Sequence, residues 1–123
     1  MRYCHSMSRE PKPAGEVWTR ERCYITELVN DPSEPQMSVA RARVEPGVTT
    51  ELHALSVLEW YVIESGQGRM RLGDTAPFDV GPGDSVQIPA QCEQQITNTG
   101  DADLLFLCVC VPRFDPSCYR PLE

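Results

Sequence analysis

Basic residues are scarce in this chain of 123 residues. It contains 11 Lys and Arg against 18 Asp and Glu, which gives a formal net charge of −7 at pH 7. A field of this sign repels phosphate backbones and anionic lipid surfaces. We therefore expect neither a nucleic-acid partner nor a membrane partner.

Long apolar runs are also missing. No stretch approaches the roughly 20 apolar residues that a membrane-spanning helix needs. The first residues, MRYCHSMSREPKPAG, lack the apolar core of a signal peptide. We expect a cytoplasmic protein, and the length is that of one domain with a real core.

The cysteines show no CxxC spacing and nothing in the sequence indicates export, which disfavours a secreted disulfide scaffold. There are six: Cys4, Cys23, Cys92, Cys108, Cys110 and Cys118. Without export we expect reduced thiols. Cys108 and Cys110 lie two apart in a strand-like run and share one face. They are either small buried hydrophobic residues or thiols that reach a pocket metal.

Helical periodicity is absent, whereas short β-rich runs are frequent. Each run is bounded by Gly, Pro, Asp or Asn, as strands are. The runs are VWTR, CYITELV, MSVARARV, LEWYVIE, GRMRLGD, DSVQIPA, EQQITNT and LLFLCVCV. So many short strands predict an all-β sandwich or barrel, in which closure or jelly-roll packing protects the edges.

Two segments carry anchors at regular spacings. In GVTTELHALSVLEWYVIESG these are Gly47, His53, Glu59 and Gly66, and in GDSVQIPAQCEQQITNTG they are Gly83, Pro89 and Asn98. Both segments resemble the signature motifs of the cupin superfamily. The chain departs from those motifs where Leu55 and Gln94 occupy two histidine positions and Gln91 occupies a glycine position. The resemblance covers about residues 37–112 and implies a small single-domain cupin, a double-stranded β-helix or jelly-roll barrel.

The same resemblance implies a metal site. Cupins of this kind commonly hold a divalent ion such as iron, manganese, nickel or zinc with three histidines and one carboxylate. The matching positions supply His53, Glu59 and the amide oxygen of Gln94, with apolar Leu55 in the remaining place. An amide oxygen is a weak ligand, so a weakened site is expected. Alternatively, Gln94 hydrogen-bonds His53 in a metal-free pocket.

Strand alternation predicts the neighbours of this site. With Glu59 pointing inward, Tyr61 and Ile63 share its face. Tyr61 is either a catalytic acid or base or a packing residue with one hydrogen bond. Ile63 and Leu55 are expected to line the substrate pocket.

Two arginines pose a separate question. Arg41 and Arg43 lie on one face of the run at residues 37–44. Facing inward, they would line the pocket and suit a substrate carboxylate or phosphate. Facing outward, they would be solvated.

The predicted organisation has three parts: a flexible arm at residues 1–15, which contains His5, a barrel at 16–112 and a tail at 113–123. Phe114 and Tyr119 are hydrophobic anchors by which the tail packs on the barrel. The resemblance to small cupins implies a homodimer.

Two functions remain open. One is a metal-dependent enzyme of isomerase, lyase or oxygenase type on a small polar or anionic metabolite. The other is a non-catalytic cupin that binds or senses a small molecule without a functional metal. Retention of His53 and Glu59 favours the first, and the replacements at Leu55 and Gln94 favour the second. The two-histidine, one-carboxylate triad of mononuclear oxygenases is not present at the matching positions.

Overall fold

The computed structural model describes residues 15–123. Their order is β1 (Val17–Trp18), β2 (Tyr24–Val29), β3 (Ser38–Val44), β4 (His53–Leu55), β5 (Leu58–Ser65), β6 (Gly68–Leu72), β7 (Phe78–Val80), β8 (Ser85–Ile88), β9 (Gln94–Asn98), β10 (Leu104–Val111), the short 3₁₀ helix η1 (Pro116–Cys118) and β11 (Tyr119–Pro121). The predicted all-β class is confirmed. The predicted arm, with His5, lies outside the described residues except for Gly15.

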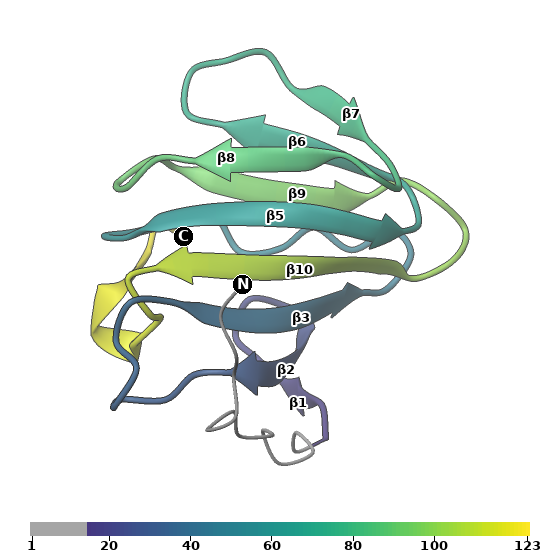
Figure 1. Cartoon of the computed structure of the whole chain (residues 1–123). Coiled ribbons are helices and arrows are strands. Elements are labelled where there is room, and N and C mark those ends of the chain that lie inside the picture. Colours follow the sequence, from purple (N-terminus) through teal and green to yellow (C-terminus); the bar gives the residue numbers. More distant parts are fainter. Residues whose placement is uncertain (1–14) are drawn as a thin grey trace, which may run out of the picture.

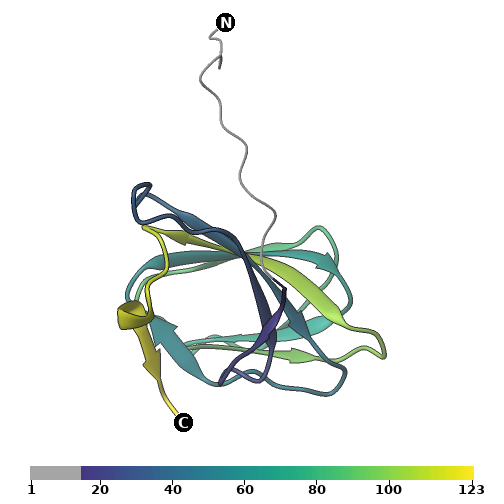
Figure 2. The ribbon, with the colours of Figure 1, turned by 90° about the horizontal axis from the view of Figure 1, so that it is seen from below.

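The strands form two antiparallel sheets that face each other (Figures 1 and 2). One has the order β1-β2-β3-β10-β5-β8 and the other β11-β4-β9-β6-β7. Strands that are distant in the chain are therefore neighbours, such as β3 beside β10. This arrangement is the predicted double-stranded β-helix. The described part of the chain contains no helix capable of crossing a membrane.

Period-2 alternation builds the interior. In β5 the side chains of Glu59, Tyr61 and Ile63 are buried, whereas those between them are only partly buried. The main core contains the fully buried Val44, Ile63, Met70, Ile88, Ile96, Leu104 and Phe106. Burial of each such side chain contributes about 1.5–3 kcal/mol.

Two residues of the cupin-like segments stabilise the backbone conformation of neighbouring loops. Gly66 has φ +89°, and a Cβ there would lie 2.6 Å from the carbonyl oxygen of Asp103, so only glycine fits. Asn98 donates to the carbonyls of Val44 and Ala102, each over 2.8 Å, and accepts from the Gly100 amide over 2.9 Å. Both residues stabilise loops of the barrel.

The C-terminal segment completes the second sheet. β11 pairs with β4, so that Tyr119 lies opposite Leu55 and Pro121 opposite His53. Phe114 and Tyr119 pack on a second hydrophobic cluster, which includes Leu55 and Cys118. Three short strands, β4, β7 and β11, were not among the predicted runs, because three residues are too few to show alternation.

Candidate functional site

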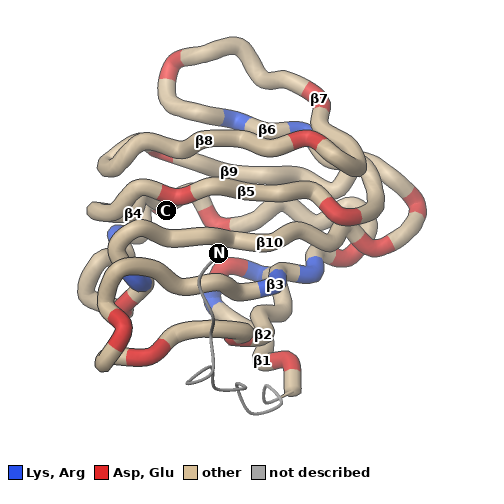
Figure 3. The backbone as a smooth tube through the Cα atoms, in the orientation of Figure 1, with Lys and Arg blue, Asp and Glu red and all other residues tan. Residues whose placement is uncertain are grey.

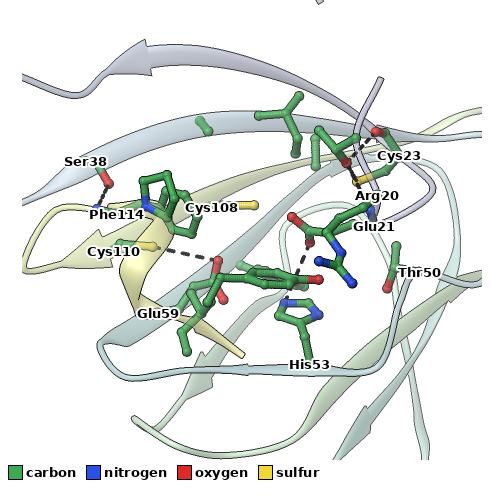
Figure 4. A pocket seen from close by; sticks show the side chains of 18 of the residues that line it. Arg20, Glu21, Cys23, Ser38, Thr50, His53, Glu59, Cys108, Cys110 and Phe114 are labelled. Carbon is green, nitrogen blue, oxygen red and sulfur yellow. Dashed lines mark hydrogen bonds and ion pairs between the residues drawn. The ribbon is translucent and has the colours of Figure 1, made fainter. Parts of the chain in front are cut away.

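A cavity of about 400 Å³ lies inside the barrel. Its polar and reactive lining comes from both sheets, the β1–β2 turn and the C-terminal segment (Figure 4). The lining residues include Arg20, Glu21, Cys23, Ser38, Thr50, His53, Leu55, Glu59, Tyr61, Phe106, Cys108, Cys110, Phe114 and Tyr119. The cavity is therefore lined by His53 from β4 of one sheet and Glu59 from β5 of the other, together with residues far from the cupin-like segments.

His53 presents one free ring nitrogen to the cavity. The side chain is 2% exposed, and its Nδ1 lies 2.7 Å from the backbone carbonyl oxygen of Glu51. A carbonyl only accepts, so Nδ1 carries the proton and Nε2 keeps its lone pair. Burial lowers the pKa of His53, although the bond to Glu51 opposes this shift, and the ring is a neutral base.

Glu59, Gln94 and Tyr61 form a buried chain of hydrogen bonds. The Tyr61 hydroxyl donates to Gln94 Oε1 over 2.7 Å, and Gln94 Nε2 donates to Glu59 Oε1 over 2.9 Å. Burial raises the pKa of Glu59 to about 8, while the Gln94 bond opposes the shift and the charge of Glu21 adds to it. Burial also raises the pKa of Tyr61 well above its usual value. At neutral pH Glu59 is therefore largely a protonated acid, held in a fixed orientation.

Glu21 is a further acidic group in the cavity, which the sequence did not reveal. It lies in the turn between β1 and β2, and its Oε1 is 3.7 Å from His53 Nε2 (Figure 4). Burial and the charge of Glu51 raise the pKa of Glu21 to about 7, and Arg20 opposes them. The only sequence signal was a short charged turn, which ordinarily indicates solvent exposure.

Tyr119 joins the C-terminal segment to this wall. Its ring stacks on His53 with centroids 4.8 Å apart, and its hydroxyl donates to Glu51. Arg20 donates to both carboxyl oxygens of Glu51, over 3.1 and 3.3 Å. Tyr119 and Glu51 thus hold the imidazole from its face and from its Nδ1 side.

Three thiols also line the cavity, among them the two that the sequence placed on one face. Cys110 Sγ lies 3.8 Å from Glu59 Oε2, while Cys108 and Cys23 lie further along the wall. Burial raises the pKa of all three, to about 12 for Cys23. They are therefore neutral thiols, which are poor nucleophiles and poor metal ligands.

The structure corrects three of the pocket predictions. Arg41 and Arg43 do not line the cavity, because the small residues Ala40 and Ala42 of the same strand do. Arg41 instead pairs with Glu64, and Arg43 with Glu16 and Asp103, on the outer face. Figure 3 marks the basic positions of β3 in blue. Ile63 belongs to the hydrophobic core rather than the cavity wall, because its side chain packs inside the main core cluster. Leu55 does line the cavity.

The donor set does not fit the three-histidine, one-carboxylate site that the cupin resemblance implies. Leu55 supplies no donor, and both polar atoms of the Gln94 amide are already bonded, to Tyr61 and Glu59. Within residues 15–123 no group of three His, Cys, Asp or Glu is arranged to hold a metal ion. His53, Glu59 and Gln94 as ligands stay a prediction.

Comparisons with known proteins agree on one family. A family model described as "Cupin domain" matches residues 40–110. An uncharacterized protein of Methanocaldococcus jannaschii is 34% identical over 109 residues, which is 85% of this chain and 86% of that protein.

Solved structures share the fold. Oxalate decarboxylase from Bacillus subtilis superposes with a TM-score of 0.75 at 24% identity, over 85% of this chain and 29% of that one. The nucleoside dehydratase Pac13 gives 0.76 at 17% identity, over 94% and 92%. An uncharacterized double-stranded β-helix protein from Klebsiella pneumoniae gives 0.72 at 14% identity, over 85% and 88%. The chain thus spans less than a third of the decarboxylase.

Proposed function

The chain belongs to the cupin family, and we propose that its cavity binds a small metabolite and transfers protons at it, as a lyase or isomerase does. One observation carries this function: a neutral imidazole with a free Nε2 and a buried carboxyl line the same cavity. A cavity of about 400 Å³ also has the size of a small-molecule site.

The two groups have complementary protonation states. His53 Nε2 is the base, because its lone pair faces the cavity and its Nδ1 proton is held by Glu51. Glu59 is the acid, because burial in the barrel keeps its proton on at neutral pH. An elimination or an isomerisation needs both: one group removes a proton from carbon and the other delivers one to the leaving oxygen or to a second carbon.

Tyr61, which the sequence singled out as catalytic, is a positioning residue in this scheme. Its hydroxyl donates to Gln94 and so orients the amide that holds Glu59.

One structural neighbour is a nucleoside dehydratase, and a dehydration also requires proton transfer. The proton-transfer proposal is therefore supported by analogy of fold.

Hydrogen exchange in D₂O tests the chemistry across many compounds at once. The protein is incubated with a panel of small metabolites that have acidic C–H bonds, and ¹H NMR follows the loss of C–H signals. We expect exchange of at least one compound that binds. His53→Gln and Glu59→Gln are expected to abolish it, and Arg41→Gln, on the outer face, to leave it unchanged.

Binding without exchange would instead establish the second function, a non-catalytic cupin that captures or senses a small molecule. Exchange that persists in His53→Gln and Glu59→Gln would refute the assignment of these two groups. Both results are read from the same spectra, because bound compounds shift or broaden protein signals.

Three further expectations accompany this function. A divalent ion at His53, Glu59 and Gln94 requires the Gln94 oxygen to give up its bond from Tyr61, so we propose at most a weak site. A homodimer is proposed from the resemblance to small cupins, and analytical ultracentrifugation tests it. A cytoplasmic location is also proposed, and fractionation of cells that express the protein tests it.

A further inference from the structure

Two groups of the cavity wall are hydrogen-bond acceptors that lack a described donor. His53 Nε2 has a lone pair and, within the described residues, no hydrogen-bond donor near it. The carboxyl group of Glu21 likewise accepts no hydrogen bond from a described side chain, and its Oε1 stays 3.7 Å from that nitrogen. A ligand that satisfies these groups must bring donors.

The cavity offers no free positive charge to a ligand. Arg20 is the only arginine or lysine among the described lining residues, and its charge is paired with Glu51, which accepts from its Nε and Nη2. His53 is neutral because burial lowers its pKa. Glu27 adds a further carboxyl among the lining residues. An anionic ligand would therefore meet carboxyl groups and one described cation that is already paired, so the wall disfavours anions.

Four aromatic side chains are also among the lining residues. They belong to Tyr61, Phe106, Phe114 and Tyr119. Ring faces attract cations through their quadrupole, and the attraction grows when the cation loses water. Acidic oxygens and aromatic faces in one enclosed space are the combination that recognises organic ammonium groups.

We propose that the ligand of this cavity is a small organic cation, a protonated amine whose N–H groups donate to the carboxylate of Glu21, beside His53. Glu21 Oε1 lies 3.7 Å from His53 Nε2, which is too far for a direct hydrogen bond, so this carboxylate is available to the ammonium group (Figure 4). The ligand class rests on the proposed small-molecule function of the same cavity. An organic cation is the opposite of the anionic metabolite that inward-facing arginines would have favoured.

Three probes of one shape and different charge test this class: 2-phenylethylammonium, 2-phenylethanol and phenylacetate. Their dissociation constants are measured at pH 7.5 by NMR titration of the labelled protein. We expect the ammonium compound to bind about tenfold more tightly than the alcohol, the size of one good charge-assisted contact. Phenylacetate is expected to bind most weakly.

Matched variants identify the acceptors. Glu21→Gln keeps the shape of the side chain and removes its charge, so the preference for the ammonium probe over the alcohol should fall severalfold. Arg41→Gln, on the outer face, should leave that preference unchanged. Thermal unfolding of each variant shows that the fold is intact.

The ligand class would be overturned if phenylacetate or the alcohol bound as tightly as the amine, or if the amine failed to bind at about 10 mM. It would equally be overturned if Glu21→Gln kept the full charge preference. These results can be distinguished from failure of the proton-transfer chemistry. Binding of the amine without hydrogen exchange would refute the chemistry alone. Exchange of a neutral or anionic compound would refute the ligand class alone.

Discussion

The side-chain amide of Gln94 donates to the carboxyl group of Glu59 over 2.9 Å, deep inside the barrel. Tyr61 sets the orientation of that amide, because its hydroxyl donates to the amide oxygen and leaves the nitrogen for Glu59. Gln94 is fully buried, so neither bond is replaced by bulk water. The motif position that holds a histidine in the family is thus used here to orient an acid.

Tyr61→Phe is expected to destabilise the protein by about 1–3 kcal/mol, because it leaves the buried Gln94 oxygen without a donor. Urea unfolding at pH 7 measures the change. Tyr24→Phe is the matched control, since the Tyr24 ring lies on the outer surface under Arg43. A loss in Tyr61→Phe no larger than in this control would show that the hydrogen bond has no structural role.

A double substitution, Leu55→His with Gln94→His, is expected to give the chain a strong metal site. It restores the three imidazoles and one carboxylate of the family pattern around His53 and Glu59. Elemental analysis of the purified double variant should give near-stoichiometric divalent metal, and clearly less in the wild type.

The control for this gain is Arg41→His, which adds an imidazole on the outer face. It should leave the metal content at the wild-type level. Near-stoichiometric metal in the wild type, lost in His53→Ala and in Glu59→Ala, would contradict our expectation and establish His53 and Glu59 as ligands.

Strand positions were largely predictable from the sequence, but the interior face of β3 was not. Alternation correctly placed Glu59, Tyr61 and Ile63 on one face of β5, and the cupin resemblance, which points Glu59 inward, decided which face that is. In β3, arginines alternate with alanines, and period 2 does not say which set faces inward. The alanines face inward, because they leave space for the cavity and because Glu16, Glu64 and Asp103 pair with the arginines outside.

The candidate site was predictable only where it follows the family spacing. His53 and Glu59 share a cavity as the resemblance implied. Glu21 comes from a charged turn, and its burial arises from tertiary contacts that no local pattern encodes. Similarly, Gln94 was expected near the site, but the direction of its amide depends on Tyr61, which lies in a strand of the other sheet.

Asn98→Ala is expected to destabilise the barrel by about 2–4 kcal/mol, because two carbonyls and one amide of the backbone lose their partner. Thr99→Ala is the matched control: Thr99 is the exposed neighbour, and its substitution should stay within about 0.5 kcal/mol. Urea unfolding measures both. Equal effects at the two positions would show that the hydrogen bonds of Asn98 are replaced by water at little cost.

Glu21→Gln is expected to stabilise the protein at pH 8 and to have no such effect near pH 4. The pKa of Glu21 rises from 4.5 to about 7 on folding, so the folded state holds this proton more tightly than the unfolded state. Stability therefore falls as pH rises from 4.5 through 7, and above that range the buried charge costs the full amount, on the order of 3 kcal/mol. Glutamine carries no charge and avoids this cost.

Urea unfolding of the wild type and Glu21→Gln at pH 4, 6 and 8 measures the difference as a function of pH. The advantage of the variant should grow across the series, and Glu34→Gln, on the exposed loop before β3, should show no comparable trend. An advantage that is the same at all three pH values would mean that the shape of the side chain, rather than its ionisation, matters. A carboxylate that lowers stability inside a cavity is expected where it binds a ligand. A measured cost at Glu21 would therefore support the proposal that an amine binds there.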